Sequence, residues 1–306
     1  DQDAEDRADF DRASVISEIV PGTDERPYEH RRCFRLNGLL GNSHVGGIAY
    51  YAGALYVSSN PNRSDDPEGL NHPYIERYEL PGLDESRLYP QRTADCDPII
   101  PSGRWKTMAS SFVSFVTLDG APSLLVGRYC KNSSKCKYPD GEAAMPYAYQ
   151  YWLDARSGDL LTFDLDPTQI QASTDIPPAF AQACDPFESD ADDGVDWTVD
   201  EALVTPRRSW CRKFRIPYQS QGVDVQHTPN SDMMLVSQSG GDIKLKQYML
   251  DELYCPRGAS CSIPKTQDTL SLVTRLQFAA GAEDLALSRG RLWSVSESGA
   301  RFFQIV

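Results

Sequence analysis

Short apolar runs separated by turn residues recur along the chain and predict β-strands. Four segments share one order, in which a small or polar approach is followed by an apolar strand, a tight turn and a second strand. These segments are 44–60, 110–129, 221–239 and 281–299. Their turns contain the Gly, Asn, Asp and Pro residues that hairpin reversals favour. The pattern therefore predicts four related β-hairpins.

A third strand is expected to follow each hairpin after a loop of variable length. These strands are predicted at 74–80, 147–153, 243–250 and 301–306. They mix apolar with polar and aromatic positions, as increasingly exposed strands do. A similar short strand precedes three of the hairpins, at 34–36, 214–216 and 274–276. A strand that ends one unit and leads into the next is typical of the blades of a β-propeller.

Through this repeated order the chain resembles the β-propeller superfamily over most of its length. The segment GAEDLALSRGRLWSVSESG at 281–299 is similar to the strand pairs of secreted bacterial propellers that have no assigned activity. The resemblance implies a fold and carries over no catalytic residue.

The spacing of the hairpins predicts the number of blades. The interval between the second and third hairpins is nearly twice each of the other two, so we expect an all-β fold with a single β-propeller of five blades. The divergent blade would lie in the irregular, acidic segment 154–212; if that segment is an insertion, four blades remain. Residues 1–30 are expected to form an N-terminal extension and 31–306 the propeller. Pairing of 34–36 with the last third strand would close the ring and remove its exposed edges.

Composition narrows the class of protein and its partners. The chain is 40% hydrophobic and 24% charged, which is typical of a soluble globular protein and excludes wholesale disorder. Its net charge of −14 repels phosphate backbones, so no nucleic-acid partner is expected. The uncharged stretch 37–62 is long enough to span a bilayer but contains many Gly, Asn and Ser residues, so no membrane insertion is expected.

Eight cysteines indicate an oxidising compartment, and hence a secreted protein, extracellular or periplasmic. Two local pairs are close enough in sequence for disulfides, and neither spacing fits a zinc site. The two local pairs are Cys130 with Cys136 and Cys255 with Cys261. The other four cysteines allow three pairings, which stay open. These four are Cys33, Cys96, Cys184 and Cys211.

Candidate site residues follow from the propeller resemblance. It implies that the start of each first strand and the end of each second strand lie on one face, around the mouth of a central channel. The polar residues expected to bind a ligand there are His44, Ser110, Arg128, Gln221, Gln238, Glu283 and Glu297.

Several chemistries fit these residues. Carboxylates with amide or backbone oxygens could hold Ca²⁺, while His44 with one carboxylate makes a weaker transition-metal site. Alternatively, His44 as base, Tyr129 as acid and Arg128 as charge neutraliser could act on a uronic acid or an ester. The polar groups could also simply hydrogen-bond one another and trapped water. The residues that would hold Ca²⁺ are Glu283, Asp284 and Glu297.

Other signals are weaker. The run 185–201 holds eight acidic residues and no basic one, but its spacing does not fit an EF-hand, so a solvated acidic loop is favoured over a calcium loop. No nucleophile-elbow motif and no phosphate-binding glycine motif occurs.

These observations predict an extracellular binding or structural module with a polar ligand or cation site. Its partner would be a small molecule, a carbohydrate or a protein. One alternative is an extracellular hydrolase or lyase, lactonase-like or acting on polysaccharide, that uses the same residues. Another is a subunit of a cell-surface assembly.

Overall fold

The described part of the chain is almost entirely β-structure. The computed structural model describes residues 14–21, 28–37, 45–59, 73–82, 96–132, 146–161, 163–164, 207–208, 210–238, 244–255, 272–277, 282–288, 291–296 and 302–305. Within these ranges the strands run from β1 to β21, and the single helix is the short α4 (Leu250–Leu253). None of the helical structure in these ranges is long and apolar enough to cross a membrane. The predicted all-β class is confirmed.

The four predicted hairpins are present. Their strands are β3 (Val45–Tyr51) with β4 (Ala54–Ser59), β8 (Phe112–Leu118) with β9 (Ala121–Gly127), β14 (Ser220–His227) with β15 (Asp232–Gln238), and β19 (Ala282–Ser288) with β20 (Arg291–Ser296). In the first hairpin φ is 49° at Ala52 and 84° at Gly53, and in the second it is 52° at Asp119 and 75° at Gly120. Two positive φ angles give the reversal whose twist matches that of the strands, which explains the glycine in each turn.

Third strands extend the hairpins in the predicted places. They are β5 (Tyr74–Glu79), β10 (Tyr147–Trp152), β16 (Lys244–Met249) and β21 (Phe302–Ile305). Fourth strands pair with three of them and then lead into the next sheet. They are β7 (Gly103–Lys106), β13 (Trp210–Arg215) and β18 (Leu272–Gln277). The strands predicted at 214–216 and 274–276 are thus confirmed, and the two-residue β17 (Tyr254–Cys255) adds an edge beside β13.

The N-terminal sheet differs from the prediction. β2 (Tyr28–Leu36) pairs antiparallel with β1 (Val15–Pro21) and parallel with β6 (Asp97–Ile99). Both edges of β2 are therefore occupied, and the predicted pairing of 34–36 with β21 is wrong. β1 alternates apolar and polar residues, and folding it back on β2 closes a far shorter loop than pairing with the other end of the chain. Part of the expected N-terminal extension thus lies in this sheet.

A disulfide bond fastens this sheet. It joins Cys33 in β2 to Cys96 beside β6, with the two Cα atoms 5.0 Å apart, and selects one of the three open pairings. Cys130 also takes part in a disulfide. The remaining cysteines have side chains outside the described residues, so the two local pairs stay predictions. These are Cys136, Cys184, Cys211, Cys255 and Cys261.

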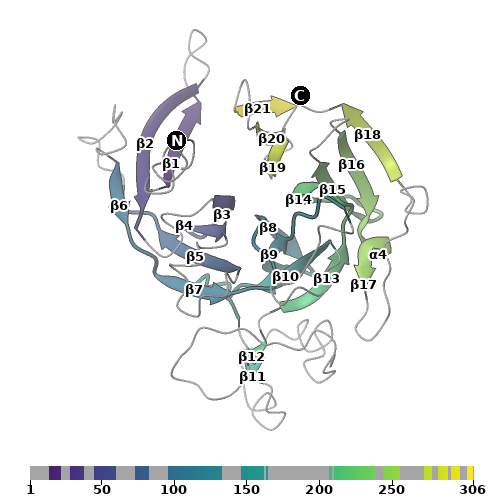
Figure 1. The fold of residues 1–306 in the computed structure, drawn as a ribbon, viewed down its shortest axis with the longest axis horizontal. Helices are drawn as coiled ribbons and strands as arrows, with labels where there is room; N and C mark the ends of the chain where they lie inside the picture. Colours follow the sequence, from purple (N-terminus) through teal and green to yellow (C-terminus); the bar gives the residue numbers. More distant parts are fainter. Residues whose placement is uncertain are drawn as a thin grey trace, which may run out of the picture.

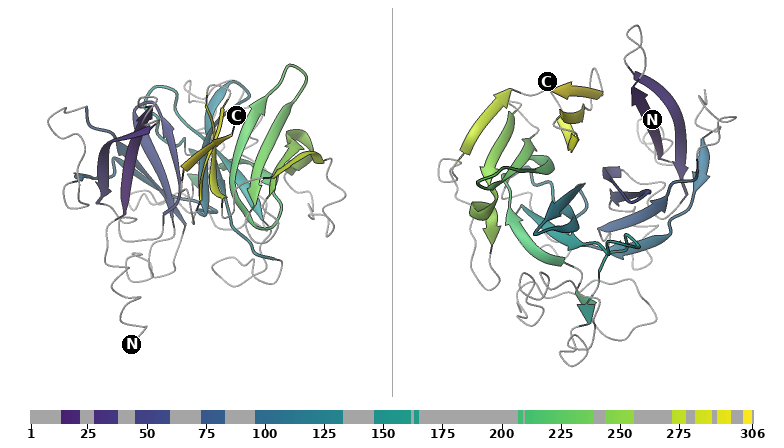
Figure 2. Two further views of the ribbon diagram at one scale, coloured as in Figure 1. Left: turned by 90° about the horizontal axis from the view of Figure 1, so that it is seen from above. Right: turned by 180° about the vertical axis from the view of Figure 1, so that it is seen from behind.

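The sheets stand side by side around a common centre (Figures 1 and 2). The first strands lie nearest that centre, where β8 packs between β3 and β14, and β14 packs on β19. β1 and β21 lie on the two sides of an opening at the top of Figure 1. Closure of the ring and the number of blades stay predictions.

Two short strands, β11 (Phe163–Asp164) and β12 (Arg207–Arg208), pair with each other on either side of residues 165–206. That interval, with the acidic run 185–201, lies outside the described residues. Whether 154–212 is a divergent blade or an insertion therefore stays open.

Hydrophobic clusters fill the spaces between neighbouring sheets. Tyr56 and Val126 belong to the cluster between the β3 and β8 sheets, and Phe112 and Val236 to the cluster between the β8 and β14 sheets. A third cluster joins the N-terminal sheet to β4 and β5. Burial on both faces explains the nearly continuous apolar runs of the central strands.

The turn 154–159 after β10 docks on the β3 sheet. Asp154 Oδ1 accepts hydrogen bonds from the backbone N–H groups of Arg156 at 2.8 Å and Ser157 at 2.6 Å. Arg77 Nη2 of β5 donates to the carbonyl oxygen of Ser157 at 2.8 Å. The turn is thus shaped by Asp154 and held by Arg77.

The Asp154 turn predicts a dependence of stability on pH. The backbone hydrogen bonds from Ser157 and Arg156 hold the pKa of Asp154 below its usual value. The unfolded chain therefore binds this proton more readily, so the stabilisation is present above the unfolded pKa and is lost as the pH falls through the folded pKa. We expect Asp154→Ala to lower the free energy of unfolding by about 1 kcal/mol at neutral pH. Urea denaturation should show this deficit shrinking in acid, and an equal deficit at both pH values would contradict it.

Candidate functional site

Three of the four inner hairpins share an irregularity at one end of the sheets, which we call the rim. The rim is the end at which β3, β8, β14 and β19 begin. In three of these hairpins the pairing shifts by one residue there, which leaves one extra residue on the first strand as a β-bulge. The extra residues are Gly46, Gln221 and Glu283. In β8 the corresponding residue is Ser111, whose backbone N–H donates to the carbonyl oxygen of Gly127 at 2.9 Å.

Each bulge interrupts the alternation of side chains between the two faces of its strand, and so redirects the side chains beside it. Bulges are frequent next to functional sites. Gln221 and Glu283 were both predicted as site residues from their position alone. The recurrence of the bulge at one place in the repeat makes the rim a structurally distinct end of the sheets.

The rim ends of β3 and β8 meet backbone to backbone. A Cβ atom at Gly46 would lie 2.3 Å from the carbonyl oxygen of Ser110, and one at Gly47 would lie 2.6 Å from the backbone nitrogen of Val113. Only glycine allows so close an approach. Ser110, a predicted site residue, is buried in this contact.

Arg128 follows β9 at the rim and is held by the backbone around it. Its Nη2 donates to the carbonyl oxygen of Met108 at 3.1 Å, and the backbone N–H of Met108 donates to the Tyr151 hydroxyl oxygen at 2.8 Å. Burial raises the pKa of Tyr151, although the Met108 hydrogen bond and the Arg128 charge lower it, so the hydroxyl stays neutral. Arg128 is a partly exposed residue whose guanidinium is held on one side by the Met108 carbonyl.

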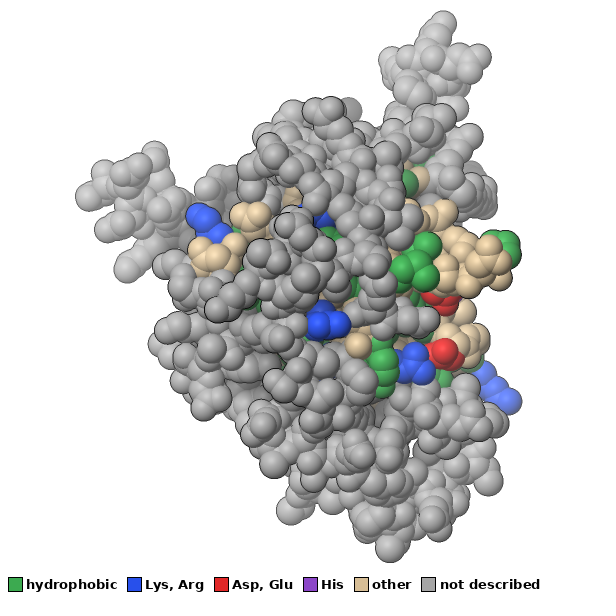
Figure 3. Space-filling view, turned by 90° about the vertical axis from the view of Figure 1, so that its right-hand side faces the viewer, with side chains coloured by type: hydrophobic (Ala, Val, Ile, Leu, Met, Phe, Trp, Pro, Cys, Tyr) green, Lys and Arg blue, Asp and Glu red, His purple; other side chains and the backbone are tan. Residues whose placement is uncertain are grey.

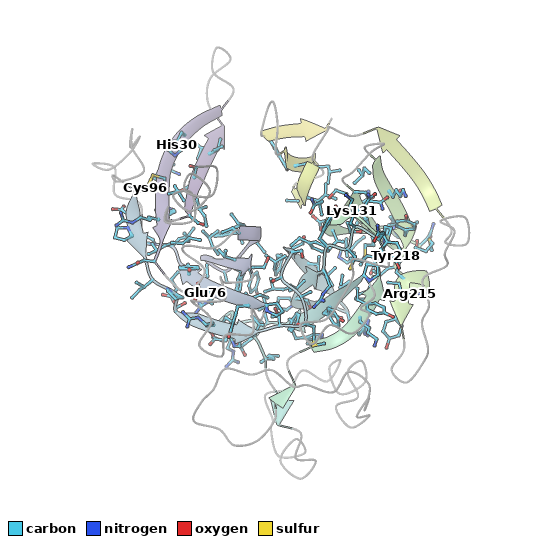
Figure 4. The ribbon with its side chains drawn as sticks, in the orientation of Figure 1. His30, Glu76, Cys96, Lys131, Arg215 and Tyr218 are labelled. Atoms are coloured by element: carbon cyan, nitrogen blue, oxygen red, sulfur yellow. A yellow bond between two sulfur atoms is a disulfide. The ribbon has the colours of Figure 1, made fainter. Side chains whose placement is uncertain are left out.

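The loop before β14 lies against the loop after β9. Gln219 donates its backbone N–H to the carbonyl oxygen of Cys130 at 2.8 Å. The buried side chain of Gln238 donates from Nε2 to the carbonyl oxygen of Tyr218 at 2.5 Å. Figure 4 shows Lys131 and Tyr218 in this part of the molecule. Two predicted residues, Arg128 and Gln238, are thus carried on adjoining rim segments.

Several basic residues lie on segments that reach this part of the rim, although the chain has a net charge of −14. Arg128, Lys131 and Arg215 lie on the segments that reach it, and Lys213 Nζ lies 5.2 Å from the centre of the Tyr147 ring at the start of β10. The two lysines and Arg215 were not among the predicted site residues. Position in the repeat could have identified two of them, because Lys131 follows a second strand and Arg215 ends a fourth strand. On the side of the molecule in Figure 3, the described side chains instead mix basic, acidic and apolar types.

The structure describes the predicted site residues to different extents: some with their side chains, some by their backbone alone, and some not at all. Glu283 and Asp284 are placed in β19 by their backbone alone, and His44 and Glu297 lie outside the described residues. No three His, Cys, Asp or Glu side chains come together in the described part of the chain. The metal hypotheses and the role of His44 as a base therefore stay predictions. The predicted residues with described side chains, all on rim segments, are Ser110, Arg128, Tyr129, Gln221 and Gln238.

A second polar cluster lies inside the hydrophobic contact between the N-terminal sheet and β5. Glu76 is fully buried; its Oε1 accepts a hydrogen bond from Arg104 Nε at 2.6 Å, and its Oε2 accepts one from the Tyr78 hydroxyl at 2.5 Å. Burial, followed by the Glu76 charge, raises the pKa of Tyr78. A buried carboxylate held in this way is typical of a structural ion pair. Figure 4 shows Glu76 among these packed side chains.

No protein-family model matches the chain, and no curated protein matches its sequence. Among solved structures, the chain is similar to the periplasmic gluconolactonase of Pseudomonas aeruginosa, with 11% sequence identity and a TM-score of 0.32. The match covers 96% of this chain and 68% of that chain. The likeness is distant.

Proposed function

We propose that the chain binds a small ligand carrying a carboxylate and several hydroxyl groups, such as a uronic acid, at the rim. The observation that carries this proposal is the fixed guanidinium of Arg128, with Lys131, Lys213 and Arg215 on neighbouring segments. A basic site on an acidic protein attracts an anion where the rest of the surface repels it.

The side chains at the rim suit such a ligand. A guanidinium binds a carboxylate through paired N–H···O bonds. The amide of Gln221 and the hydroxyl of Tyr129, both on partly exposed residues, can each donate to and accept from sugar hydroxyls. A binding module of this kind is the first of the functions that the sequence predicts.

We place this site in a five-bladed propeller of an extracellular or periplasmic protein. The placement is supported by sheets that stand around a common centre and by the buried disulfide between Cys33 and Cys96, since such bonds persist in oxidising compartments.

Isothermal titration calorimetry with galacturonate, and with galactose as the uncharged comparison, tests the proposal. We expect wild type to prefer galacturonate and Arg128→Ala to bind it about 10- to 100-fold more weakly, the loss expected for hydrogen bonds to a charged group. Lys131→Ala removes an exposed cation and should weaken binding about threefold. The matched control is Arg156→Ala, which removes an exposed arginine from the turn 154–159 and should bind as wild type does.

Three kinds of result would count against the proposal. The first is a binding result, either equal affinity for the two sugars or unchanged affinity in both Arg128→Ala and Lys131→Ala. The second is a melting temperature raised by CaCl₂, reversed by EDTA and unaffected by sugar, which would favour a cation at Glu283, Asp284 and Glu297. The third is consumption of the ligand, which would favour a hydrolase or lyase with His44 and Tyr129 in acid–base roles.

A further inference from the structure

Three basic residues of the β8 sheet point to the same face, because of how their strands pair. The backbone N–H of Arg128 donates to the carbonyl oxygen of Tyr147 at 3.2 Å, which continues the β9–β10 register. Tyr147 pairs on its other side with Arg215 of β13. Residues paired across adjacent strands lie on one face, so Arg128, Tyr147 and Arg215 form a row. Lys213 lies two residues before Arg215 in β13 and shares this face.

The buried neighbours of the row identify the face. Ala148 and Phe214 alternate with the row residues along their strands and belong to the cluster between the β8 and β14 sheets. Tyr147 belongs to the cluster between the β3 and β8 sheets. The row therefore points towards the side of the β3 sheet. The hydrogen bond from Arg128 to the carbonyl oxygen of Met108 agrees with this, because Met108 lies between β7 and β8, in the segment that joins these two sheets.

The row runs outward from the centre of the molecule. β8, β9, β10 and β13 follow one another in the sheet, and β8 lies nearest the centre (Figure 1). The Cα atoms of Arg128 and Arg215 are two strand spacings apart, about 10 Å, and that of Lys213 lies about 7 Å further along β13. Tyr147 is buried between them, with Lys213 Nζ 5.2 Å from the centre of its ring. All three basic residues are partly exposed, so positive charge is spread along a line.

We propose that the ligand is an oligosaccharide of uronic acids, which binds along this row from Arg128 to Arg215 and Lys213. The inference rests on the proposed function, because it assigns the first carboxylate to Arg128. A single uronic acid carries one carboxylate and can meet only one of two cations about 10 Å apart. A chain of uronic acids carries a carboxylate on every sugar, so successive sugars would meet successive cations.

The charge of the whole protein favours this ligand over a nucleic acid. Nucleic-acid-binding domains are basic over a broad surface that follows the phosphate backbone, whereas this chain has a net charge of −14. A short row of cations on an acidic protein suits a short run of carboxylates. Sugar hydroxyls between the carboxylates also suit the neutral donors and acceptors at the rim, such as Tyr129.

Isothermal titration calorimetry with galacturonate and with its linear trimer tests the inference. We expect wild type to bind the trimer about 10- to 100-fold more tightly than the monomer, because the later carboxylates bind within an already formed complex. Arg215→Ala and Lys213→Ala should each weaken binding of the trimer about three- to tenfold, and weaken binding of the monomer less. Arg128→Ala should weaken binding of both ligands.

Arg212→Ala is the matched control on the same strand. Arg212 precedes Lys213 and points to the opposite face of β13, where its Nη1 lies 2.8 Å from Asp119 Oδ2. The variant removes one positive charge, as Lys213→Ala does, but none from the row. We expect it to bind the trimer as wild type does. A loss equal to that of Lys213→Ala would show that net charge, and not the row, sets the affinity, and would overturn the inference.

The remaining outcomes separate this inference from the proposed function. A wild type that binds the monomer and the trimer equally well would overturn the inference and leave the proposed function standing. No binding of either would overturn both. A gain with chain length that survives in Arg215→Ala and Lys213→Ala would place the chain elsewhere and overturn the inference. A single-stranded oligonucleotide that binds more tightly than the trimer would replace the uronic acid chain with a nucleic acid.

Discussion

Replacing Cys33 and Cys96 together by alanine is expected to lower the free energy of unfolding by about 4 kcal/mol. The bond spans 63 residues of sequence, and a cross-link that closes a loop of this length removes much of the conformational freedom of the unfolded chain. The loop contains β3, β4 and β5, so the bond within the N-terminal sheet closes a loop that holds most of the sheet on which it packs. Urea denaturation of oxidised wild type and the double variant measures the difference.

The predicted local pair provides the control for this experiment. Cys255→Ala with Cys261→Ala would open a much shorter loop, and the same entropic argument gives a loss of about 2 kcal/mol. The order of the two losses is the informative result. A smaller loss for the Cys33–Cys96 pair, or a wild type whose stability is unchanged by reductant, would contradict the assignment of this bond as the main constraint on the N-terminal half.

Gly46→Ala is expected to be the most damaging single substitution at the rim. Its Cβ would lie 2.3 Å from the carbonyl oxygen of Ser110, a backbone atom that cannot swing aside as a flexible side chain can. β3 would have to move away from β8, and overpacking of this kind costs about 3 kcal/mol. Because the displacement also shifts the bulge beside Ser110 and Arg128, we expect weaker binding of galacturonate in any protein that still folds.

Gly82→Ala is the matched control for Gly46→Ala. Nothing lies within 4 Å of a Cβ built at Gly82, so alanine should be neutral there or slightly stabilising, by less than about 1 kcal/mol. Thermal unfolding and calorimetry of both variants measure the two effects. Equal melting temperatures for Gly46→Ala and Gly82→Ala would show that β3 and β8 do not touch as described.

Local patterns were enough to predict most of the strands. Tight turns such as Ala52-Gly53 separate apolar runs of strand length, so the four hairpins and their third strands follow from neighbouring residues alone. β7 escaped prediction because four residues, Gly103–Lys106, carry too little pattern. The pairing of β2 was predicted wrongly because register between distant segments depends on which competing partner is nearest, and residues 1–30 were expected to form an extension with no strand at 15–21.

The candidate site was predictable in position but not in geometry. Placing Arg128 and Gln238 at the ends of second strands needed only the repeat. The bulge at Gln221, the Met108 contact that fixes Arg128, and the contributions of Lys131 and Arg215 depend on backbone register and on loops that meet only in the folded protein. A single sequence holds no pattern from which such contacts could be derived.

The order of the strands has a consequence for biosynthesis. Because the fourth strand of a sheet is made just before the first strand of the next, the four main strands of the β3, β8 and β14 sheets can each pair before the following sheet leaves the ribosome. The edge strand β17 joins the β8 sheet later. The N-terminal hairpin has to wait for β6 and for Cys96 before it is locked. A nascent chain of this architecture would therefore acquire stability in steps, from its amino end towards its carboxyl end.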